Sequence, residues 1–245
     1  TIQHKTSGVN SVALNATVHS AVLPCLHAPS ASAPTPRSAP DMLFDERTWL
    51  VQHQAEEVYE RGDYDRAFFI YRNELAPIGD KYGQYMVGYM YLTGQGVPEN
   101  HIAASAWYRL AAERGTKEFV SVRDELLAAL DDRQRGESDR MFIELRKEYS
   151  DLVLIAQAVR HDYETLKART GPRLGSNSAR LTVVEVDSGE THIGVEYYGR
   201  IERRMKARLA YIAQHTEIEI IDLDAENIDV DAIEDQVVDH MERLD

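Results

Sequence analysis

The chain has 245 residues, of which 43% are hydrophobic and 28% are charged, with a formal net charge of −14. A chain of this length can bury the core of one moderate domain or of two small ones. The negative charge repels phosphate backbones and disfavours a nucleic-acid partner. No run approaches the roughly 18 consecutive apolar residues of a transmembrane helix, so no membrane span is predicted.

Residues 1–40 differ in composition from the rest of the chain. They hold five of the eight prolines and no Asp or Glu, and such a stretch cannot bury enough apolar surface to fold alone. We predict a disordered or signal-peptide-like head. Lys5, the weakly apolar run 12–26 and the small residues 31–33 favour export, so the expected location is periplasmic or secreted. A cytoplasmic tail is the alternative, and a lipid anchor at Cys25 fits least because proline precedes it.

The chain carries a helical motif that recurs after 37 residues. The two copies are Tyr64-x-x-Ala67-x-x-x-Tyr71 and His101-x-x-Ala104-x-x-x-Tyr108. In the second copy one helix face is formed by Ala104, Trp107, Tyr108, Ala111 and Ala112. Their spacing is that of an α-helix. Helix pairs with small residues at their contacts expose a face that only a neighbouring pair can cover, which predicts a stack of pairs, a short α-solenoid.

Glycines mark the turns and a close approach in this repeat. Gly88 lies inside the helix that precedes the second copy, where it predicts close contact with another helix. The loop 93–100 contains Gly94, Gly96 and Pro98 and ends at an asparagine suited to cap a helix. Gly115 follows the second helix at the position of a C-cap.

Residues 84–100, together with the Trp-Tyr and Ala-Ala pairs that follow them, resemble the SEL-one-like repeat, a relative of the tetratricopeptide repeat. A second unit over 51–79 matches only in part, because it lacks the Gly-x-Gly-Val-Pro loop and the tryptophan. The resemblance covers about residues 50–130. It implies a scaffold of antiparallel helices that binds proteins and has no catalytic residue, cofactor or metal of its own. The branch of the family rich in cysteine pairs is excluded, since this chain has one cysteine.

A protein-binding groove is expected to use the tyrosines of the repeat region. Eight of the thirteen tyrosines lie between residues 59 and 108, and tyrosine is enriched at interface hot spots. We expect Tyr82, Tyr89, Tyr108 and Trp107 to contact the partner, with flanking acids that disfavour anionic partners. Packing within the core is the competing interpretation for these side chains.

The remaining sequence predicts further helices and one hairpin. Helices around 119–130, 141–149 and 152–166 would cap the solenoid, which places the repeats and cap at 41–168. A strand at 180–186, a turn at 187–190 and a return strand at 191–194 predict a hairpin. With helices at 195–212 and 233–244, this hairpin forms a small α+β extension at 176–245. The expected fold class is therefore mainly α, a short α-solenoid of antiparallel helix pairs with a C-terminal α+β extension.

The acidic excess is concentrated at the C-terminus. Residues 217–245 carry twelve acidic side chains and one basic one, a net of eleven negative charges. The preceding helix has a basic face, formed by Arg200, Arg203, Arg204, Lys206 and Arg208. We expect the 200–208 face, through Arg200, Arg204 and Arg208, to attract the acidic 217–245 segment, within one chain or by self-association. Exposed ion pairs are weak, so the effect would be on docking.

Candidate sites for chemistry are few. The acidic run from Asp222 resembles a calcium loop, but Asn227 and Ile233 occupy the positions that require Gly and Glu. The leading hypothesis is a non-enzymatic protein–protein interaction scaffold of the bacterial cell envelope. One alternative is an enzyme or metal-dependent protein with its site in 150–245, built from His161, Glu164 or His192. Another is a structural subunit of an envelope assembly.

Overall fold

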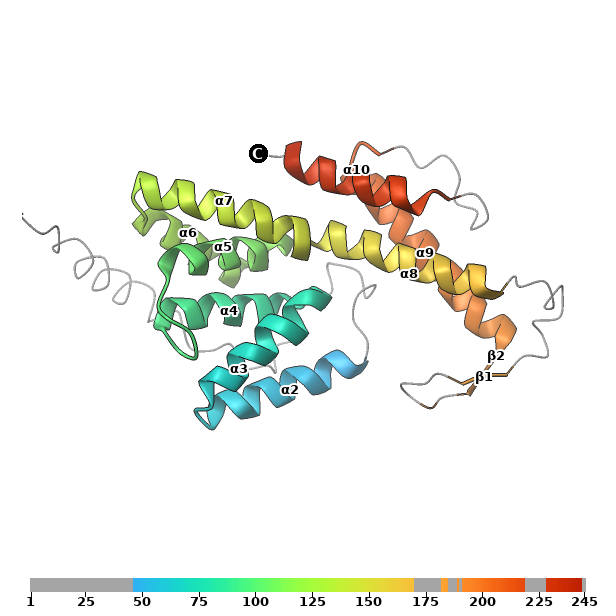
Figure 1. Cartoon of the computed structure of the whole chain (residues 1–245), viewed down its shortest axis with the longest axis horizontal. Helices are drawn as coiled ribbons and strands as arrows, with labels where there is room; N and C mark the ends of the chain where they lie inside the picture. Colours follow the sequence, from blue (N-terminus) through green and yellow to red (C-terminus); the bar gives the residue numbers. More distant parts are fainter. Residues whose placement is uncertain (1–45, 170–181, 185–188, 190, 219–227, 244–245) are drawn as a thin grey trace, which may run out of the picture. The chain divides into compact units, whose positions relative to one another are not determined.

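The computed structural model describes residues 46–169, 182–184, 189, 191–218 and 228–243, and the chain divides into two compact units (Figure 1). The first unit ends at Tyr149 and the second begins at Ser150. The described residues are mainly helical with one small antiparallel sheet, which is the predicted fold class.

The first unit begins with a helix pair joined by a tight turn. Helix α2 (Glu46–Glu60) is followed by α3 (Tyr64–Ile70). Gly62 supplies the left-handed backbone of the turn at φ 79°, and the side chain of Asp63 caps α3 by accepting from the amide of Arg66. The chain then continues through a π-helical turn (Tyr71–Leu75) and a 3₁₀ turn (Ala76–Ile78).

The second pair is α4 (Lys81–Thr93) and α5 (His101–Ala111), followed by a 3₁₀ turn (Ala112–Arg114). The loop between the helices turns at Gly94 and Gly96, with φ values of 67° and 69°. Asn100 caps α5, since its side-chain oxygen accepts from the amides of Ile102 and Ala103. Gly115 ends the pair at φ 72°.

A third pair completes the first unit. Helix α6 (Lys117–Ala129) packs on α5, and α7 (Asp132–Tyr149) packs along the same helix. Helix α5 thus contacts α4, α6 and α7, so the helices after the second pair extend the expected stack (Figure 1).

The first two pairs differ in length by one residue, and the π-helical turn absorbs the difference. Tyr71 and Tyr108 are equivalent at an offset of 37, whereas the capping Gly79 and Gly115 are equivalent at an offset of 36. The amides of these glycines bond to equivalent carbonyls at 3.1 and 2.9 Å. In the first pair the amide of Ala76 bonds to the carbonyl of Tyr71, five residues earlier. A π-turn accommodates one extra residue in this way.

The core of the first unit is built from small residues and aromatic rings. Ala67, Ala104 and Ala111 are fully buried between helices. A Cβ at Gly88 would lie 3.1 Å from the ring of Tyr108, so α4 and α5 approach closely at the predicted glycine. The contact thus depends on a missing side chain in one helix and a large ring in the other.

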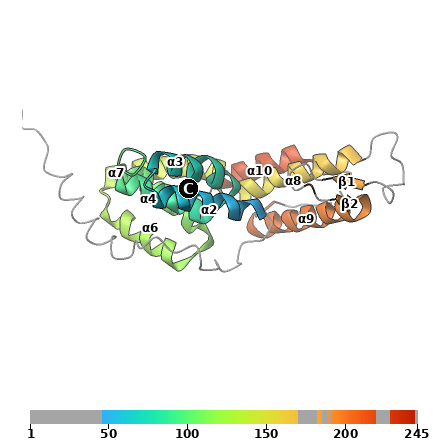
Figure 2. The ribbon, with the colours of Figure 1, turned by 90° about the horizontal axis from the view of Figure 1, so that it is seen from below.

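The second unit contains α8 (Asp151–Arg169), α9 (Gly194–His215) and α10 (Val230–Arg243). Helix α8 packs against both α9 and α10 (Figure 2). The boundary between the units lies at 149/150, whereas the predicted repeats and cap extend to 168, because α8 packs with α9 and α10. Its apolar side chains pair with those of α9 and α10, which were assigned to a separate extension.

The predicted hairpin is present in the second unit. Strand β1 (Thr182–Val184) pairs antiparallel with β2 (Thr191–Ile193), and Val183 lies opposite His192. Both strands contact α9. A two-stranded hairpin is marginal by itself, so this packing on a helix is the support that it requires.

Replacing Gly96 with alanine tests the packing of the repeat loop on α3. A Cβ at this position would lie 2.2 Å from the carbonyl oxygen of Tyr64, which is backbone and cannot move aside easily. The matched control is Gly115→Ala, which has a similar positive φ but no atom within 4 Å of the added Cβ. We expect the control to lose about 1–2 kcal/mol of unfolding free energy and Gly96→Ala to lose about 1–3 kcal/mol more, in urea unfolding. Equal losses would contradict this packing.

Candidate protein-binding surface of the repeat unit

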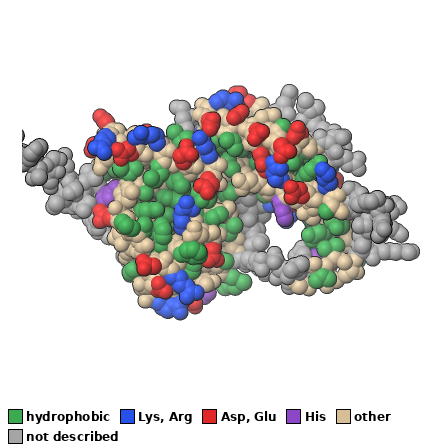
Figure 3. All heavy atoms as spheres, viewed as in Figure 1, with side chains coloured by type: hydrophobic (Ala, Val, Ile, Leu, Met, Phe, Trp, Pro, Cys, Tyr) green, Lys and Arg blue, Asp and Glu red, His purple; other side chains and the backbone are tan. Residues whose placement is uncertain are grey.

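Aromatic and polar side chains of α2 and α4 form one partly exposed surface. Trp49, Glu56 and Tyr59 lie on one face of α2, because they are spaced by seven and three residues. Tyr82 and Tyr89, seven residues apart, lie on one face of α4. We call these five residues the tyrosine face. Hydrophobic side chains gather over the middle of the first unit, with most charged side chains near its margins (Figure 3).

Interactions between hydroxyl and carboxylate groups connect the two helices of the tyrosine face. Tyr82 interacts with the carboxylate of Glu56, and Tyr59 with the hydroxyl of Tyr89. The hydroxyl of Tyr59 also donates a 2.6 Å hydrogen bond to Oε1 of Gln95, in the loop after α4. The polar atoms of this surface are therefore held in fixed positions.

Burial shifts the titration of these groups toward their neutral forms. It raises the pKa of Glu56 above that of an ordinary carboxyl, while the Tyr82 hydroxyl and His53 act in the opposite direction. Burial also raises the pKa of Tyr82 and of Tyr59. Both phenols consequently stay protonated at physiological pH and serve as hydrogen-bond donors.

Two of the expected groove residues are packed inside the unit. Tyr108 is fully buried against Gly88 and the ring of Tyr85, 5.1 Å away. Trp107 is 2% exposed and its ring lies 5.6 Å from that of Tyr149. The structure therefore does not support partner contact by these two side chains. A helical period identifies one face of a helix but does not show whether that face is covered by a neighbour.

A buried carboxylate fixes α2 against the start of α4. Asp80 is 3% exposed and accepts hydrogen bonds from Nε2 of Gln52 and, at 2.5 Å, from the amide of Gly83. Burial raises the pKa of Asp80 to about 6, although these hydrogen bonds and the positive charges of Arg114 and Lys81 act in the opposite direction. Its only signal in the sequence is its position directly after a glycine, so it was not among the predicted site residues.

A second buried group links the helix pairs. Nζ of Lys81 donates to Oε1 of Gln84 at 3.1 Å and to Oε2 of Glu113 at 2.7 Å. Nε2 of Gln84 donates in turn to the carbonyl oxygens of Ala76 and Tyr149. These atoms belong to all three helix pairs, so the network makes them one body.

Two arginines of the basic face of α9 share a buried carboxylate on α8. Arg204 and Arg208 both reach the carboxylate of Asp162 on α8, at 2.5 Å each, and Asp162 is fully buried. One carboxylate balances only one of the two guanidinium charges, so the expected attraction between this face and the acidic C-terminal segment stays a prediction. Self-association through this face stays a prediction.

The acidic helix α10 is held by an arginine of α8. Arg160 donates to both carboxylate oxygens of Glu234, at 2.7 and 2.6 Å, and lies 2.6 Å from Asp231. A bidentate pair of this kind fixes the orientation of both side chains. Residues 219–227 of the acidic segment lie outside the described residues.

The candidates for chemistry remain dispersed. His161 and Glu164 are exposed on α8, and in the described part of the chain no group of three or more His, Cys, Asp or Glu side chains could hold a metal ion. The calcium-loop candidate at 222–227, the head 1–40 and Cys25 lie outside the described residues. None of the helices described here is long and apolar enough to cross a membrane.

Comparison with known families identifies the repeat. The family model of the Sel1 repeat matches residues 81–116, which are α4, α5 and the turns that end them. The chain carries a Sel1 repeat. Comparisons with curated proteins and with solved structures give no match. Sel1 repeats build helical solenoids that act as protein–protein interaction scaffolds and are generally non-catalytic, so the repeat suggests protein partners for this chain.

Asp80 should make the stability of the first unit depend on pH in a defined direction. Its pKa is about 6 in the folded protein against 3.8 for an ordinary carboxyl, so the folded state binds the proton more tightly. The unfolding free energy of the wild-type protein therefore rises as the pH falls from 6 toward 4. Asp80→Asn is always neutral and keeps an acceptor oxygen. We expect its stability relative to wild type to fall by about 2 kcal/mol between pH 7 and pH 4, measured by urea unfolding. If the difference in unfolding free energy between Asp80→Asn and wild type were the same at pH 7 and pH 4, the raised pKa of Asp80 would be contradicted.

Proposed function

We propose that the first unit, which carries the Sel1 repeat, binds a protein partner across the tyrosine face of α2 and α4 and catalyses no reaction. The observation that carries this proposal is Trp49, which is 64% exposed at one end of the face, beside Leu50 at 59%. Adjacent exposed apolar side chains form a contiguous patch of the kind that marks interaction sites, and tryptophan and tyrosine are enriched at interface hot spots.

The geometry of the tyrosine face supports a division of roles within it. Trp49 supplies apolar contact area, and its ring is already stacked on His53 at 5.6 Å, so little ordering is required on binding. Tyr82 and Tyr89 supply hydroxyl groups for hydrogen bonds. Glu56 places a negative charge between the helices, which disfavours an anionic partner at this surface.

Removing the exposed tryptophan tests the proposed surface. In affinity capture with chemical cross-linking, Trp49→Ala should recover the partner with at least about tenfold weaker affinity. Thermal unfolding should be nearly unchanged, because the side chain is mostly in solvent. The control is Val184→Ala, an apolar side chain of the second unit that is 59% exposed. Equal recovery of partners by wild type and Trp49→Ala would rule out this surface.

We also propose that the scaffold works in a bacterial cell envelope. The support is the order of a basic residue, an apolar run at 12–26 and small residues at 31–33 in the head. Expression with a C-terminal tag and fractionation should place the protein in the periplasm, with a mature N-terminus near residue 34. Recovery from the cytoplasm with residues 1–33 still attached would contradict export.

A further inference from the structure

One arginine recurs at the same position of each helix pair. Arg72, Arg109 and Arg146 are separated by 37 residues each, which is the offset of the repeat motif. Each follows a buried side chain, namely Tyr71, Tyr108 and Leu145. The three arginines are themselves only partly buried. We call them the arginine row.

Aromatic rings of α7 and α5 lie under the guanidinium groups of the arginine row. The guanidinium of Arg109 lies 4.0 Å and that of Arg146 5.5 Å from the ring centre of Phe142. These two arginines thus share one ring on α7. Stacking on an aromatic face fixes the plane of a guanidinium and leaves its edge available for hydrogen bonds.

Arg72 is fixed in the same way at the other end of α7. Its guanidinium lies 4.9 Å from the ring centres of both Trp107 and Tyr149, and Nη1 donates a 2.7 Å hydrogen bond to the hydroxyl of Tyr149. Phe142 and Tyr149 are two helical turns apart on α7, a separation of about 10 Å. Arg109 and Arg72 therefore mark two positions about 10 Å apart along this helix.

Arg72 differs from the other fixed arginines in its charge partners. Arg109 pairs with Asp139 at 2.5 Å, and Arg160 and Arg204 pair with carboxylates of the second unit. No carboxylate in the described part of the chain forms an ion pair with Arg72. Its guanidinium has five N–H donors and uses one of them on a neutral hydroxyl. Phe69, one turn earlier, is 57% exposed and gives the position an apolar border.

We propose that the arginine row binds an extended acidic segment of a protein partner, in which one carboxylate is held by Arg72 and a second pairs with Arg109. The partner is identified by local charge complementarity, since Arg72 is a cation held in place by two rings and forms no ion pair with a carboxylate of the described residues. An extended chain advances about 3.3 Å per residue, so acids about three residues apart match the spacing of the two guanidiniums. Asp139 is 57% exposed and can give up its place on Arg109.

This surface goes beyond the tyrosine face, which lies on other helices and disfavours anions. One internal charge opposes the proposed binding. The hydroxyl of Tyr149 donates a 2.7 Å hydrogen bond to Oε1 of Glu148, so a carboxylate is attached to the same hydroxyl that accepts from Arg72. Removing that charge should strengthen binding of an acidic segment, whereas removing Arg72 should weaken it.

The test uses synthetic ten-residue peptides of alternating leucine and polar residues, with acids three residues apart, titrated into the full chain by calorimetry. Matched peptides carry Asn and Gln in place of Asp and Glu. We expect only the acidic peptides to bind. Arg72→Gln should weaken their binding at least about tenfold. Arg72→Lys should also weaken it, because an ammonium group neither stacks on the aromatic rings nor forms a bidentate pair with a carboxylate. Glu148→Gln should strengthen it about two- to fivefold.

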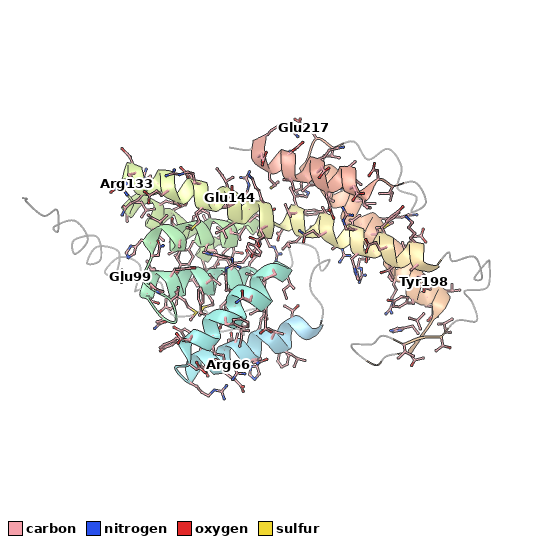
Figure 4. The ribbon with its side chains drawn as sticks, viewed as in Figure 1. Arg66, Glu99, Arg133, Glu144, Tyr198 and Glu217 are labelled. Atoms are coloured by element: carbon pink, nitrogen blue, oxygen red, sulfur yellow. The ribbon has the colours of Figure 1, made fainter. Side chains whose placement is uncertain are left out.

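The matched control is Arg133→Gln. Arg133 is 87% exposed at the beginning of α7, away from Tyr149 at its end, and should leave binding unchanged (Figure 4). Equal binding of acidic and amide peptides, unchanged binding by Arg72→Gln, or no binding by any peptide would overturn the proposal. Tighter peptide binding by Glu148→Gln could not result from partial unfolding of the variant. If the chain formed a dimer in sedimentation and Arg72→Gln abolished that dimer, the proposal would be overturned, because the occupant of the arginine row would be a second copy of this chain. The titration contains no captured partner, so its outcome is independent of the Trp49→Ala experiment.

Discussion

Gln84 makes the contact on which the repeat unit depends. It lies fully buried near the beginning of α4, where its side-chain amide donates to the carbonyls of Ala76 and Tyr149, each at 3.3 Å. These carbonyls belong to the ends of the first and third helix pairs, and Lys81 donates to its oxygen. Buried backbone carbonyls need such partners. One glutamine therefore satisfies two helix ends at once, and the helix pairs on either side of α4 hold a common position because of it.

Much of the repeat could be read from the sequence, because the relevant signals are local. A glycine with positive φ, an asparagine cap and alanines at helical spacing each identify a structure within a few residues, and the loop around Gly94, Gly96 and Asn100 has these features in the structure. The hairpin also followed from the alternation of side chains on each side of a turn.

The features that the sequence does not reveal are contacts between distant segments. Trp107 and Tyr108 lie on the expected helix face, but α4 and α7 cover that face, which no spacing within one helix reveals. Arg208 and Asp162 are 46 residues apart, so no local signal in the sequence pairs them. Charge composition shows that pairs will form. It does not select among them when a fully buried carboxylate competes with exposed ones, because only the buried one requires its arginine.

The π-helical turn at Tyr71–Leu75 bears on what the period of the repeat means. The segment from Tyr71 to its capping glycine is one residue longer than the segment from Tyr108 to its own, yet both end in the same left-handed cap with the same hydrogen bond. The extra residue is taken up within one widened turn. The two helix pairs thus share the same end, a left-handed glycine with the same hydrogen bond. The number of residues between equivalent positions differs by one. A period of 36 and a period of 37 describe the same building block.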